Sequence, residues 1–297
     1  MCDKIFKLAP AKVNLALSVG AADPTAEGRH PICSWMVNVN LFDELELTRS
    51  HPDSMSLYSI DWCEDAPRRS DIDWPITRDL AVRAHLLLEE HLDRRLPLRL
   101  KMRKRIPVGS GLGGGSGDAA AMLRACNELF QLEMTTDDLF DLAMQLGSDV
   151  GFALKGGSAL VEGFGERLKH VPHREEHLVL IFPEQGCPTG EVYRAFDDIS
   201  KGRVADRNRV QALVDQPLSE DAPFNDLKEP ACIVNQDLNE VLRDVSALAE
   251  SPAHLTGSGS AVFVVCSDSI HAEALALAIT DRLNLPARPV RTLADLP

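Results

Sequence analysis

The chain has 297 residues, of which 44% are hydrophobic, and it carries a formal net charge of −14 at pH 7. This length and composition allow a large buried core, organised as one big or two moderate globular domains. The acidic balance excludes a general affinity for nucleic acid or anionic membranes, so local positive groups would have to meet any phosphorylated ligand.

The first predicted element is a strand over residues 13–19, where apolar and other residues alternate. A period of two is typical of a strand with one buried face. Lys12 and Asn14 fall together on the opposite face. Further strands are predicted over residues 35–47 and 98–102, with a helix over residues 80–91 between them.

A glycine-rich loop follows, with the sequence PVGSGLGGGSGDAAA over residues 107–121. Glycine accepts positive φ and lets backbone N–H groups approach an anion closely. Residues 118–130 have helical spacing of their apolar positions, so the loop leads into a helix N-terminus, whose free N–H groups and dipole also attract phosphate. The sequence therefore predicts a phosphate-binding loop.

Other interpretations of this loop fit less well. Gly109, Gly111 and Gly114 satisfy the dinucleotide pattern G-x-G-x-x-G. That pattern also expects an acidic residue about 20 positions later, at the end of a second strand, and here the region predicts the start of another helix. A nucleoside-triphosphatase P-loop needs Lys and then Ser or Thr after its last glycine, and here Ser116 follows Gly115 directly. A flexible linker is disfavoured because an apolar helix begins at once.

The next predicted helix carries apolar residues over 139–146. Thr135 and Asp138 form a capping-box pattern ahead of it, and Gly147 stands where a helix C-cap belongs. Asp149 follows this stop. A strand is then predicted over residues 178–182, and a final strand and helix over 253–266 and 272–283.

The segment HLTGSGSAVFVV, residues 254–265, is a second glycine-rich element. Gly257 and Gly259 lead into a strand rather than a helix. Taken alone, the pattern indicates an ordinary strand-entry turn.

Seven cysteines are scattered along the chain without a C-x-x-C pair, which favours a reducing compartment over disulfides or a zinc site. The first residues lack the apolar core of a signal peptide, and no run approaches the length needed to span a bilayer. We expect a cytoplasmic protein with small-molecule partners, present as a monomer or weak homodimer and without nucleic-acid or membrane partners.

Three separated motifs, PAKVNLAL, IPVGSGLGGGSGDAA and LTGSGSAVF, resemble the signature motifs of the GHMP small-molecule kinases. The resemblance implies an α+β, two-lobed fold with an N-terminal ATP-binding lobe, a C-terminal substrate lobe and the active site between them. We expect the domains to span residues 1–163 and 164–297.

Further segments resemble the 4-diphosphocytidyl-2-C-methyl-D-erythritol kinase family, including LGSDVGFALKGGSALVEGFGERL, PTGEVYRAFD and FNDL. This likeness covers residues 7 to about 266. It implies transfer of a phosphoryl group from ATP, with Mg²⁺, to the 2-hydroxyl of the methylerythritol part of a cytidine diphosphate sugar-alcohol. The alternatives are a GHMP kinase for another small alcohol, or a non-catalytic GHMP-fold ligand sensor. Retention of Lys12 and Asp149 disfavours the sensor.

The resemblance also assigns residues. Asp149 would accept the hydroxyl proton, and Lys12 would keep that carboxylate ionised and stabilise developing charge. No residue is assigned as a metal ligand, although Ser116 is a candidate to bond a phosphate oxygen or a magnesium-bound water. The ATP-binding set is Asp79, Lys104, Pro107, Gly109, Gly111, Leu112, Gly113, Gly114, Gly115 and Ser116. The substrate-binding set is Asn14, Arg29, His30, Thr189, Tyr193, Gly257 and Ser258.

The chain departs from the family pattern at three places. The usual Ser-Ser pair is Ser116-Gly117, which removes one hydroxyl. The usual Gly-Tyr-His is Gly28-Arg29-His30, so Arg29 and Tyr193 are the candidates to stack on the cytosine, with His30 reading its edge. Asp79 stands where the family often has asparagine near the adenine.

Overall fold

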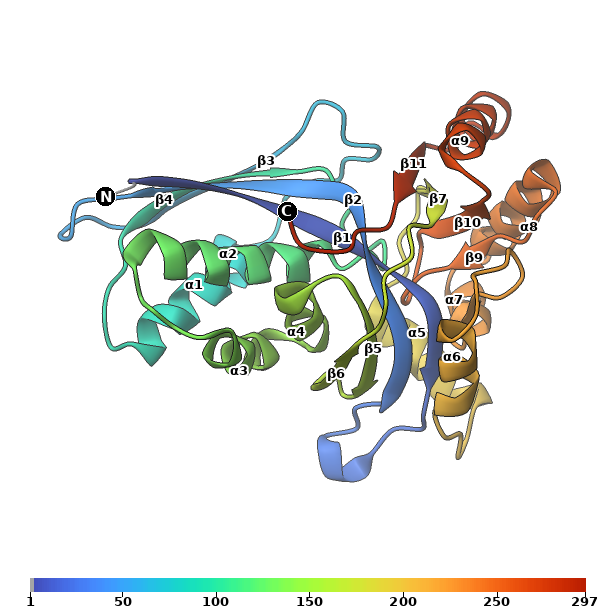
Figure 1. The fold of residues 1–297 in the computed structure, drawn as a ribbon, viewed down its shortest axis with the longest axis horizontal. Coiled ribbons are helices and arrows are strands. Elements are labelled where there is room, and N and C mark those ends of the chain that lie inside the picture. Colours follow the sequence, from blue (N-terminus) through green and yellow to red (C-terminus); the bar gives the residue numbers. More distant parts are fainter. Residues whose placement is uncertain (1–2) are drawn as a thin grey trace.

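Two β-sheets, each with its own helices, organise the chain into two lobes (Figure 1). The computed structural model describes residues 3–297. The first sheet has seven strands, in the order β3-β4-β2-β1-β8, with β5 paired to β2 and β6 paired to β5. Its strands are β1 (Lys4–Val19), β2 (Ile32–Arg49), β3 (Leu57–Trp62), β4 (Leu98–Lys104), β5 (Ser158–Gly163), β6 (Arg167–His170) and β8 (Phe224–Asn225).

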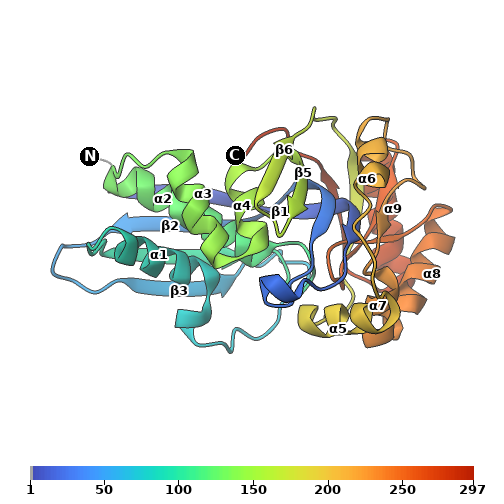
Figure 2. The same ribbon diagram turned by 90° about the horizontal axis from the view of Figure 1, so that it is seen from below.

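Four helices cover one face of this sheet, and Figure 2 shows them in front of its strands. They are α1 (Leu80–His91), α2 (Gly114–Phe130), α3 (Thr136–Leu146) and α4 (Ser148–Lys155). Their apolar faces and the inward residues of β2 and β4 form one core cluster. The predicted capping box is confirmed, because the amide of Asp138 donates to Oγ1 of Thr135 and the amide of Thr135 donates to Asp138. Two 3₁₀ turns, η1 (Pro24–Ala26) and η2 (Ile76–Arg78), precede β2 and α1.

The long strands β1 and β2 reach from one lobe into the other (Figure 1). They pair antiparallel along most of their length, with register shifts at Pro10/Ala11 and between Asn14 and Ala16. One part of β2 pairs with β4 and the other with β5. The two irregularities therefore flank the segment of β1 that carries Lys12.

The expectation that β1 has one buried face is wrong, because both of its faces are buried from Ala9 to Val19. Lys12 is bonded through its amide to the carbonyl of Leu112, and the amide of Asn14 donates to Oγ1 of Thr256. Both partners lie in the glycine-rich segments, which cover the polar face of the strand. The alternation predicts the strand correctly. It does not predict that the polar face is buried, because the glycine-rich segments that cover it are remote in the sequence.

The second sheet has the order β11-β7-β10-β9. Its strands are β7 (His177–Ile181), β9 (His254–Leu255), β10 (Val262–Cys266) and β11 (Ala287–Arg291). The helices of this lobe are α5 (Thr189–Ile199), α6 (Arg207–Val214), α7 (Lys228–Val234), α8 (Asp237–Ala249) and α9 (Ser269–Leu283).

Several elements late in the chain join the first lobe. The strand β6 extends the first sheet beyond residue 163, and β8 pairs in parallel with Ala16 and Leu17 of β1. After β11 the chain returns across the first lobe (Figure 1), where the amide of Leu293 donates to the carbonyl of Asn38. The division between residues 163 and 164 stays a prediction. The first sheet contains strands from both sides of it, since β6 and β8 follow residue 163.

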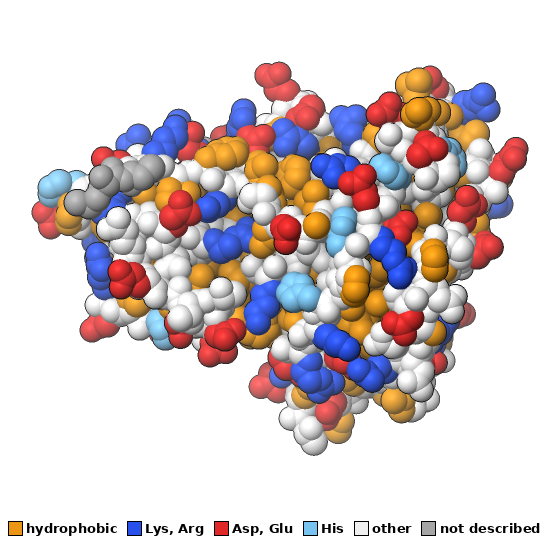
Figure 3. Space-filling model, viewed as in Figure 1, with side chains coloured by type: hydrophobic (Ala, Val, Ile, Leu, Met, Phe, Trp, Pro, Cys, Tyr) orange, Lys and Arg blue, Asp and Glu red, His pale blue; other side chains and the backbone are white. Residues whose placement is uncertain are grey.

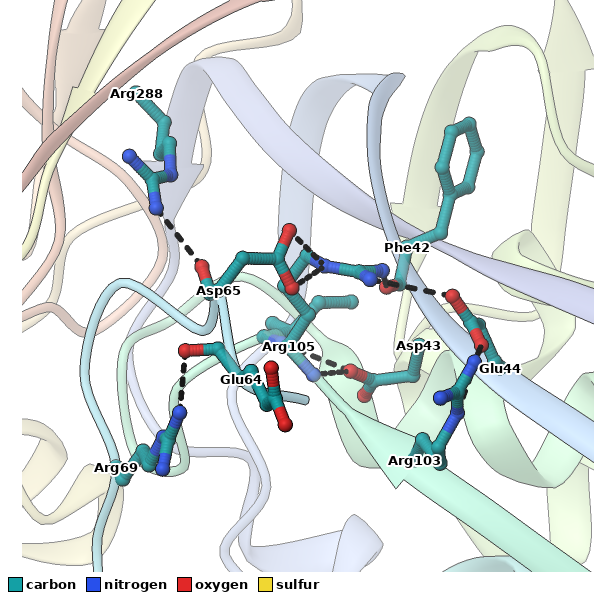
Figure 4. A network of polar contacts seen from close by, with 10 residues as sticks. Phe42, Asp43, Glu44, Glu64, Asp65, Arg69, Arg103, Arg105 and Arg288 are labelled. Carbon is teal, nitrogen blue, oxygen red and sulfur yellow. Dashed lines mark hydrogen bonds and ion pairs between the residues drawn. The ribbon is translucent and has the colours of Figure 1, made fainter. Parts of the chain in front are cut away.

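The segment after β3 also connects the lobes. Figure 4 shows Arg288 of β11 donating to the carbonyl of Asp65, at 2.8 Å, while the carboxylate of Asp65 holds Arg105. The half-buried guanidinium of Arg68 donates to the carbonyls of Pro183, Glu184 and Val108. The start of the glycine-rich loop is thereby tied to the second lobe.

Candidate active site

A cavity of about 560 Å³ lies where the two lobes meet. The first lobe contributes residues of β1, the glycine-rich loop and the start of α4. The second lobe contributes Thr189, Tyr193, Gly257 and Ser258. This position agrees with the predicted two-lobed arrangement.

The loop between β4 and α2 forms one wall of the cavity. Gly109, Gly111 and Gly113 all have φ near +70°, in the left-handed region that favours glycine. A Cβ at Gly111 would collide with the carbonyl of Thr256, so the two glycine-rich segments approach backbone to backbone. The amide of Ala261 completes this contact by donating to the carbonyl of Ser110 at 3.0 Å.

The helix after the loop begins earlier than expected, at Gly114 rather than Asp118. The N-cap of α2 is Gly113, and no side chain caps this helix. Ser116 lies in the first turn of α2 and lines the cavity. Because no side chain caps the helix, its first N–H groups stay open toward the cavity, as an anion site requires.

Lys12 and Asp149 lie together in the cavity. The ammonium Nζ of Lys12 is 3.4 Å from Oδ2 of Asp149 and 2.6 Å from Oδ1 of Asn14. Asn14 is itself fixed, because its Nδ2 donates to Ser34, whose hydroxyl donates to the carbonyl of Ala16. Asn14, predicted to bind substrate, therefore also holds the lysine in place.

Asp149 follows the stop at Gly147, as predicted, and it occupies the first turn of α4, a helix that the sequence pattern did not indicate. Gly147 ends α3, as predicted, and α4 begins at the next residue. A carboxylate in the first turn is favoured by the helix dipole. The turn also points Asp149 into the cavity, where its side chain is 32% exposed.

Two predicted ATP-binding side chains have partners within the protein. Asp79 caps α1, because its Oδ1 accepts from the amides of Ala81 and Val82. Lys104 is buried and lies 2.6 Å from both Asp43 and Asp118. Burial alone would lower the pKa of Lys104, but the two carboxylates outweigh it and raise that pKa above its ordinary value.

On the second-lobe side, Thr189 and Ser258 share a hydrogen bond of 2.9 Å. Burial raises the pKa of Tyr193, and the negative charge of Asp149 raises it further. The ring of Tyr193 contacts that of His30 at 4.8 Å between centroids. His30 and Arg29 are not among the lining residues described, and the guanidinium of Arg29 lies over Phe164, 4.7 Å from its centroid.

The sequence analysis missed other residues of the cavity and its floor, namely Trp74, Arg78, Ser110 and the carboxylates of Asp43 and Asp118. The two carboxylates had a signal in the sequence. Asp43 falls on the same face of its predicted strand as Leu45 and Leu47. Asp118 falls on the same face of its predicted helix as Met122 and Cys126. A charge at an apolar position of a strand or helix requires a buried partner.

The face of the molecule drawn in Figure 3 carries basic and acidic side chains side by side, without a continuous patch of one sign. Arg78 and Lys12 line the cavity, whereas the whole chain is strongly acidic. Local basic groups and helix dipoles, rather than the overall field, must therefore attract an anion. Among residues 3–297 no group of three or more His, Cys, Asp or Glu side chains is placed to hold a metal ion, and no helix there is long and apolar enough to cross a membrane.

Comparisons with known proteins agree with this architecture. Residues 79–159 match the GHMP kinases N terminal domain. A 4-diphosphocytidyl-2-C-methyl-D-erythritol kinase of Desulfitobacterium hafniense (strain Y51) is 34% identical over 288 residues, covering 92% of this chain and 91% of that protein. Another, from Caulobacter vibrioides (strain NA1000 / CB15N), is 34% identical over 284 residues and covers 92% and 93%.

Solved structures are similar as well. The crystal structure of a 4-(cytidine 5'-diphospho)-2C-methyl-D-erythritol kinase has a TM-score of 0.77 and 32% identity, covering 97% of this chain and 99% of that one. A homoserine kinase of Cytophaga hutchinsonii has a TM-score of 0.69 at 20% identity, covering 100% and 96% of the two chains. The second likeness concerns the fold alone.

Proposed function

The chain belongs to the 4-diphosphocytidyl-2-C-methyl-D-erythritol kinase family. On this premise we propose that it uses ATP to phosphorylate the 2-hydroxyl of 4-diphosphocytidyl-2-C-methyl-D-erythritol. The observation that carries the proposal is the placement of Lys12 and Asp149, 3.4 Å apart, in the same cavity as the glycine-rich loop. The product is a phosphate monoester in the non-mevalonate route to isoprenoid precursors.

Asp149 is the general base that takes the proton of the attacking hydroxyl. The ammonium of Lys12, 3.4 Å from this carboxylate, stabilises the negative charge that develops between hydroxyl and phosphate. Phosphoryl transfer needs little covalent help from the protein, so alignment and charge stabilisation provide most of the catalysis. Asn14 supports this by holding Lys12 at 2.6 Å.

The phosphates of ATP lie along the loop from Pro107 to Ser116. The three left-handed glycines line the cavity, where backbone amides can bind an anion, and the uncapped N-terminus of α2 adds its dipole. Bound together with the nucleotide, Mg²⁺ would supply positive charge that offsets that of the phosphates. The hydroxyl of Ser116 is the side-chain group of the loop that would contact a phosphate oxygen or a water of that ion.

The acceptor substrate lies on the second-lobe side, against Tyr193 and the Thr189–Ser258 pair. Gly257 allows close approach, since a Cβ there would lie 3.2 Å from Nζ of Lys12. The aromatic ring of Tyr193 offers a face for the cytosine, and His30 beside it offers a hydrogen-bonding edge. We propose that Arg29 completes this subsite from its position over Phe164.

A coupled assay for ADP release tests the function. The purified chain is given ATP and Mg²⁺ with the cytidine diphosphate substrate, mevalonate, phosphomevalonate or homoserine in parallel. Turnover is expected with the first compound alone. Turnover only with another alcohol would make the chain a different GHMP kinase, and ATP binding without turnover on any of them would favour a sensor.

We further propose that the chain works in the cytoplasm on small molecules, as a monomer or weak homodimer, without nucleic-acid or membrane partners. The six described cysteines are free and mostly buried, which fits a reducing compartment. Light scattering of the purified chain at several concentrations measures the oligomeric state. A tight assembly at low micromolar concentration would contradict this part of the proposal.

A further inference from the structure

Three buried charged side chains meet beneath the glycine-rich loop. The ammonium of Lys104 lies 2.6 Å from Oδ2 of Asp43 and 2.6 Å from Oδ2 of Asp118. All three residues are at most 3% exposed. They come from the end of β4, the middle of β2 and the first turns of α2, so one lysine joins three elements.

Asp43 also holds the start of the loop through the backbone. Its second oxygen, Oδ1, accepts from the amides of Arg105 and Ile106, the latter at 2.8 Å (Figure 4 shows the contact with Arg105). Charge-assisted hydrogen bonds of this kind are short and roughly twice as strong as neutral ones. The position of Asp43 therefore fixes where the chain leaves β4.

The other end of the loop is fixed from the same point. A Cβ at Gly114 would lie 2.9 Å from Cγ2 of Ile106 and 3.5 Å from Oδ2 of Asp43, so the first turn of α2 rests on the residues that begin the loop. Asp118 lies one turn further along α2 and binds the same ammonium. The distance between the end of β4 and the start of α2 is thus set by contacts with Lys104 and Asp43.

This geometry bears on what Lys104 does. Two carboxylates engage its ammonium, and its removal would leave both buried without their cation, an arrangement that costs far more than an exposed ion pair. We propose that Lys104, Asp43 and Asp118 are positioning residues that set the span of the glycine-rich loop, and thereby aim its amides at the phosphates of ATP. The inference rests on the proposed function, and it gives Lys104, predicted as an ATP-binding residue, an indirect role through the position of the loop.

The experiment compares nucleotide affinities in a graded series at Asp118. Asp118→Leu removes one arm of the contact but leaves the neutral Lys104–Asp43 pair, whereas Asp118→Asn keeps an oxygen that can accept from Lys104. Glu128→Leu is the matched control, because it removes an exposed carboxylate from the same helix. Affinities for ATP, ADP and adenosine are measured by calorimetry or competition, together with the KM of the acceptor.

We expect Asp118→Leu to weaken ATP and ADP by about tenfold to a hundredfold, the scale of a misplaced binding group. Asp118→Asn should weaken them by roughly threefold, because a neutral hydrogen bond replaces a charge-assisted one. Adenosine affinity and the acceptor KM should stay within about twofold of wild type, and Glu128→Leu should leave every affinity unchanged. A merely structural role would instead lower all affinities together with stability.

Several outcomes would overturn the inference. ATP affinity equal to wild type in folded Asp118→Leu would show that the loop keeps its span without this contact. An equal loss for adenosine would assign the cluster to the base rather than the phosphates. If Asp118→Leu does not fold, unchanged ATP affinity in Asp118→Asn decides against the inference. Failure of the wild-type chain to bind ATP would instead overturn the proposed function, and the inference with it.

Discussion

Lys12 has little freedom to move, because its neighbours surround it on several sides. Its Nζ donates to Asn14, and a Cβ at Gly113 would lie 2.9 Å from its Cγ. Its side chain is 8% exposed, against 32% for Asp149. The position of the Lys12 side chain is therefore fixed before substrate binds, while the carboxylate of Asp149 stays accessible to a substrate.

The first prediction concerns this pair. Asp149→Asn should lower kcat by about 10²–10⁴-fold, the usual worth of a general base, while ATP affinity stays near wild type. Steady-state ADP release at saturating substrates measures the rate, and calorimetry measures ATP binding. Asp137→Asn, at an exposed position of the neighbouring α3, is the control. Near-normal turnover in Asp149→Asn would remove this residue from the mechanism.

The second prediction concerns the aromatic side of the cavity. Tyr193→Ala should weaken the cytidine substrate by roughly tenfold to a hundredfold, since a lost stacking partner costs about 1–3 kcal/mol and about 1.4 kcal/mol equals one decade. ATP affinity should not change. Tyr193→Phe keeps the ring and should retain wild-type affinity. Competition with free CDP and UDP is the measurement, and no preference for CDP in wild type would count against a cytidine subsite.

At the scale of elements, the glycine-rich loop contains left-handed positions with different surroundings. Gly109 has φ +69° and open space within 4 Å of where a Cβ would stand, whereas Gly113 has φ +68° and faces Lys12. Gly114 is not left-handed, so any substitution there acts through the clash with Ile106. The role of each glycine thus differs along one loop.

The third prediction uses this contrast. Gly113→Ala and Gly109→Ala should each cost about 1–2 kcal/mol of stability from the left-handed backbone. Only Gly113→Ala should also lower kcat, by displacing Lys12 from Asp149, because a small misplacement of a reacting group slows the reaction strongly. Thermal unfolding and steady-state kinetics on both variants provide the comparison. Equal kcat in the two variants would show that Gly113 acts on the backbone alone.

Periodicity predicts most elements that surround the site. The helix over residues 80–91 coincides with α1, and the spans 98–102 and 178–182 fall within one or two residues of β4 and β7. The pattern puts the start of α2 too late because glycines have a low helix propensity, whereas in the structure Gly114 packs closely on Ile106 in the first turn. Local pattern does not include such tertiary contacts.

The same limit applies to the candidate site. Motif resemblance predicts that Lys12, Asp149 and the glycine-rich loop share one site, and all three line the cavity. It does not indicate that Lys104 is held by Asp43 and Asp118, because these residues are far apart in the chain. The sequence shows that Asp43 and Asp118 occupy positions on apolar faces. It does not show that they meet Lys104, because that contact depends on the strand register in which Leu45 lies opposite Met102.

At the scale of the whole molecule, the two lobes are joined by the returning chain after β11. Thr292 is 1% exposed and belongs to this segment. Its hydroxyl accepts from the amide of Glu176 and donates to the carbonyl of Arg174, both at 3.0 Å. It also forms a bridge with Val39 of β2. One residue thus connects β2 to the start of β7.

The fourth prediction follows from these contacts. Thr292→Val should lower the free energy of unfolding by about 1–3 kcal/mol, because it removes two partly buried hydrogen bonds that contribute about 0.5–1.5 kcal/mol each. Urea unfolding measures the loss. Thr280→Val, at an exposed position of α9, should change stability much less. A loss in Thr292→Val no larger than in this control would show that the segment contributes little to joining the lobes.

The return of the chain to Asn38 also affects how the protein is made. A ribosome delivers β1 and β2 early, yet the residues that pair with them at β8 and Leu293 are synthesised much later. Contacts so distant in sequence form slowly, and an unpaired strand edge is open to other chains while it waits. The first lobe therefore emerges with part of its sheet uncovered, and it is completed only after the second lobe has been translated.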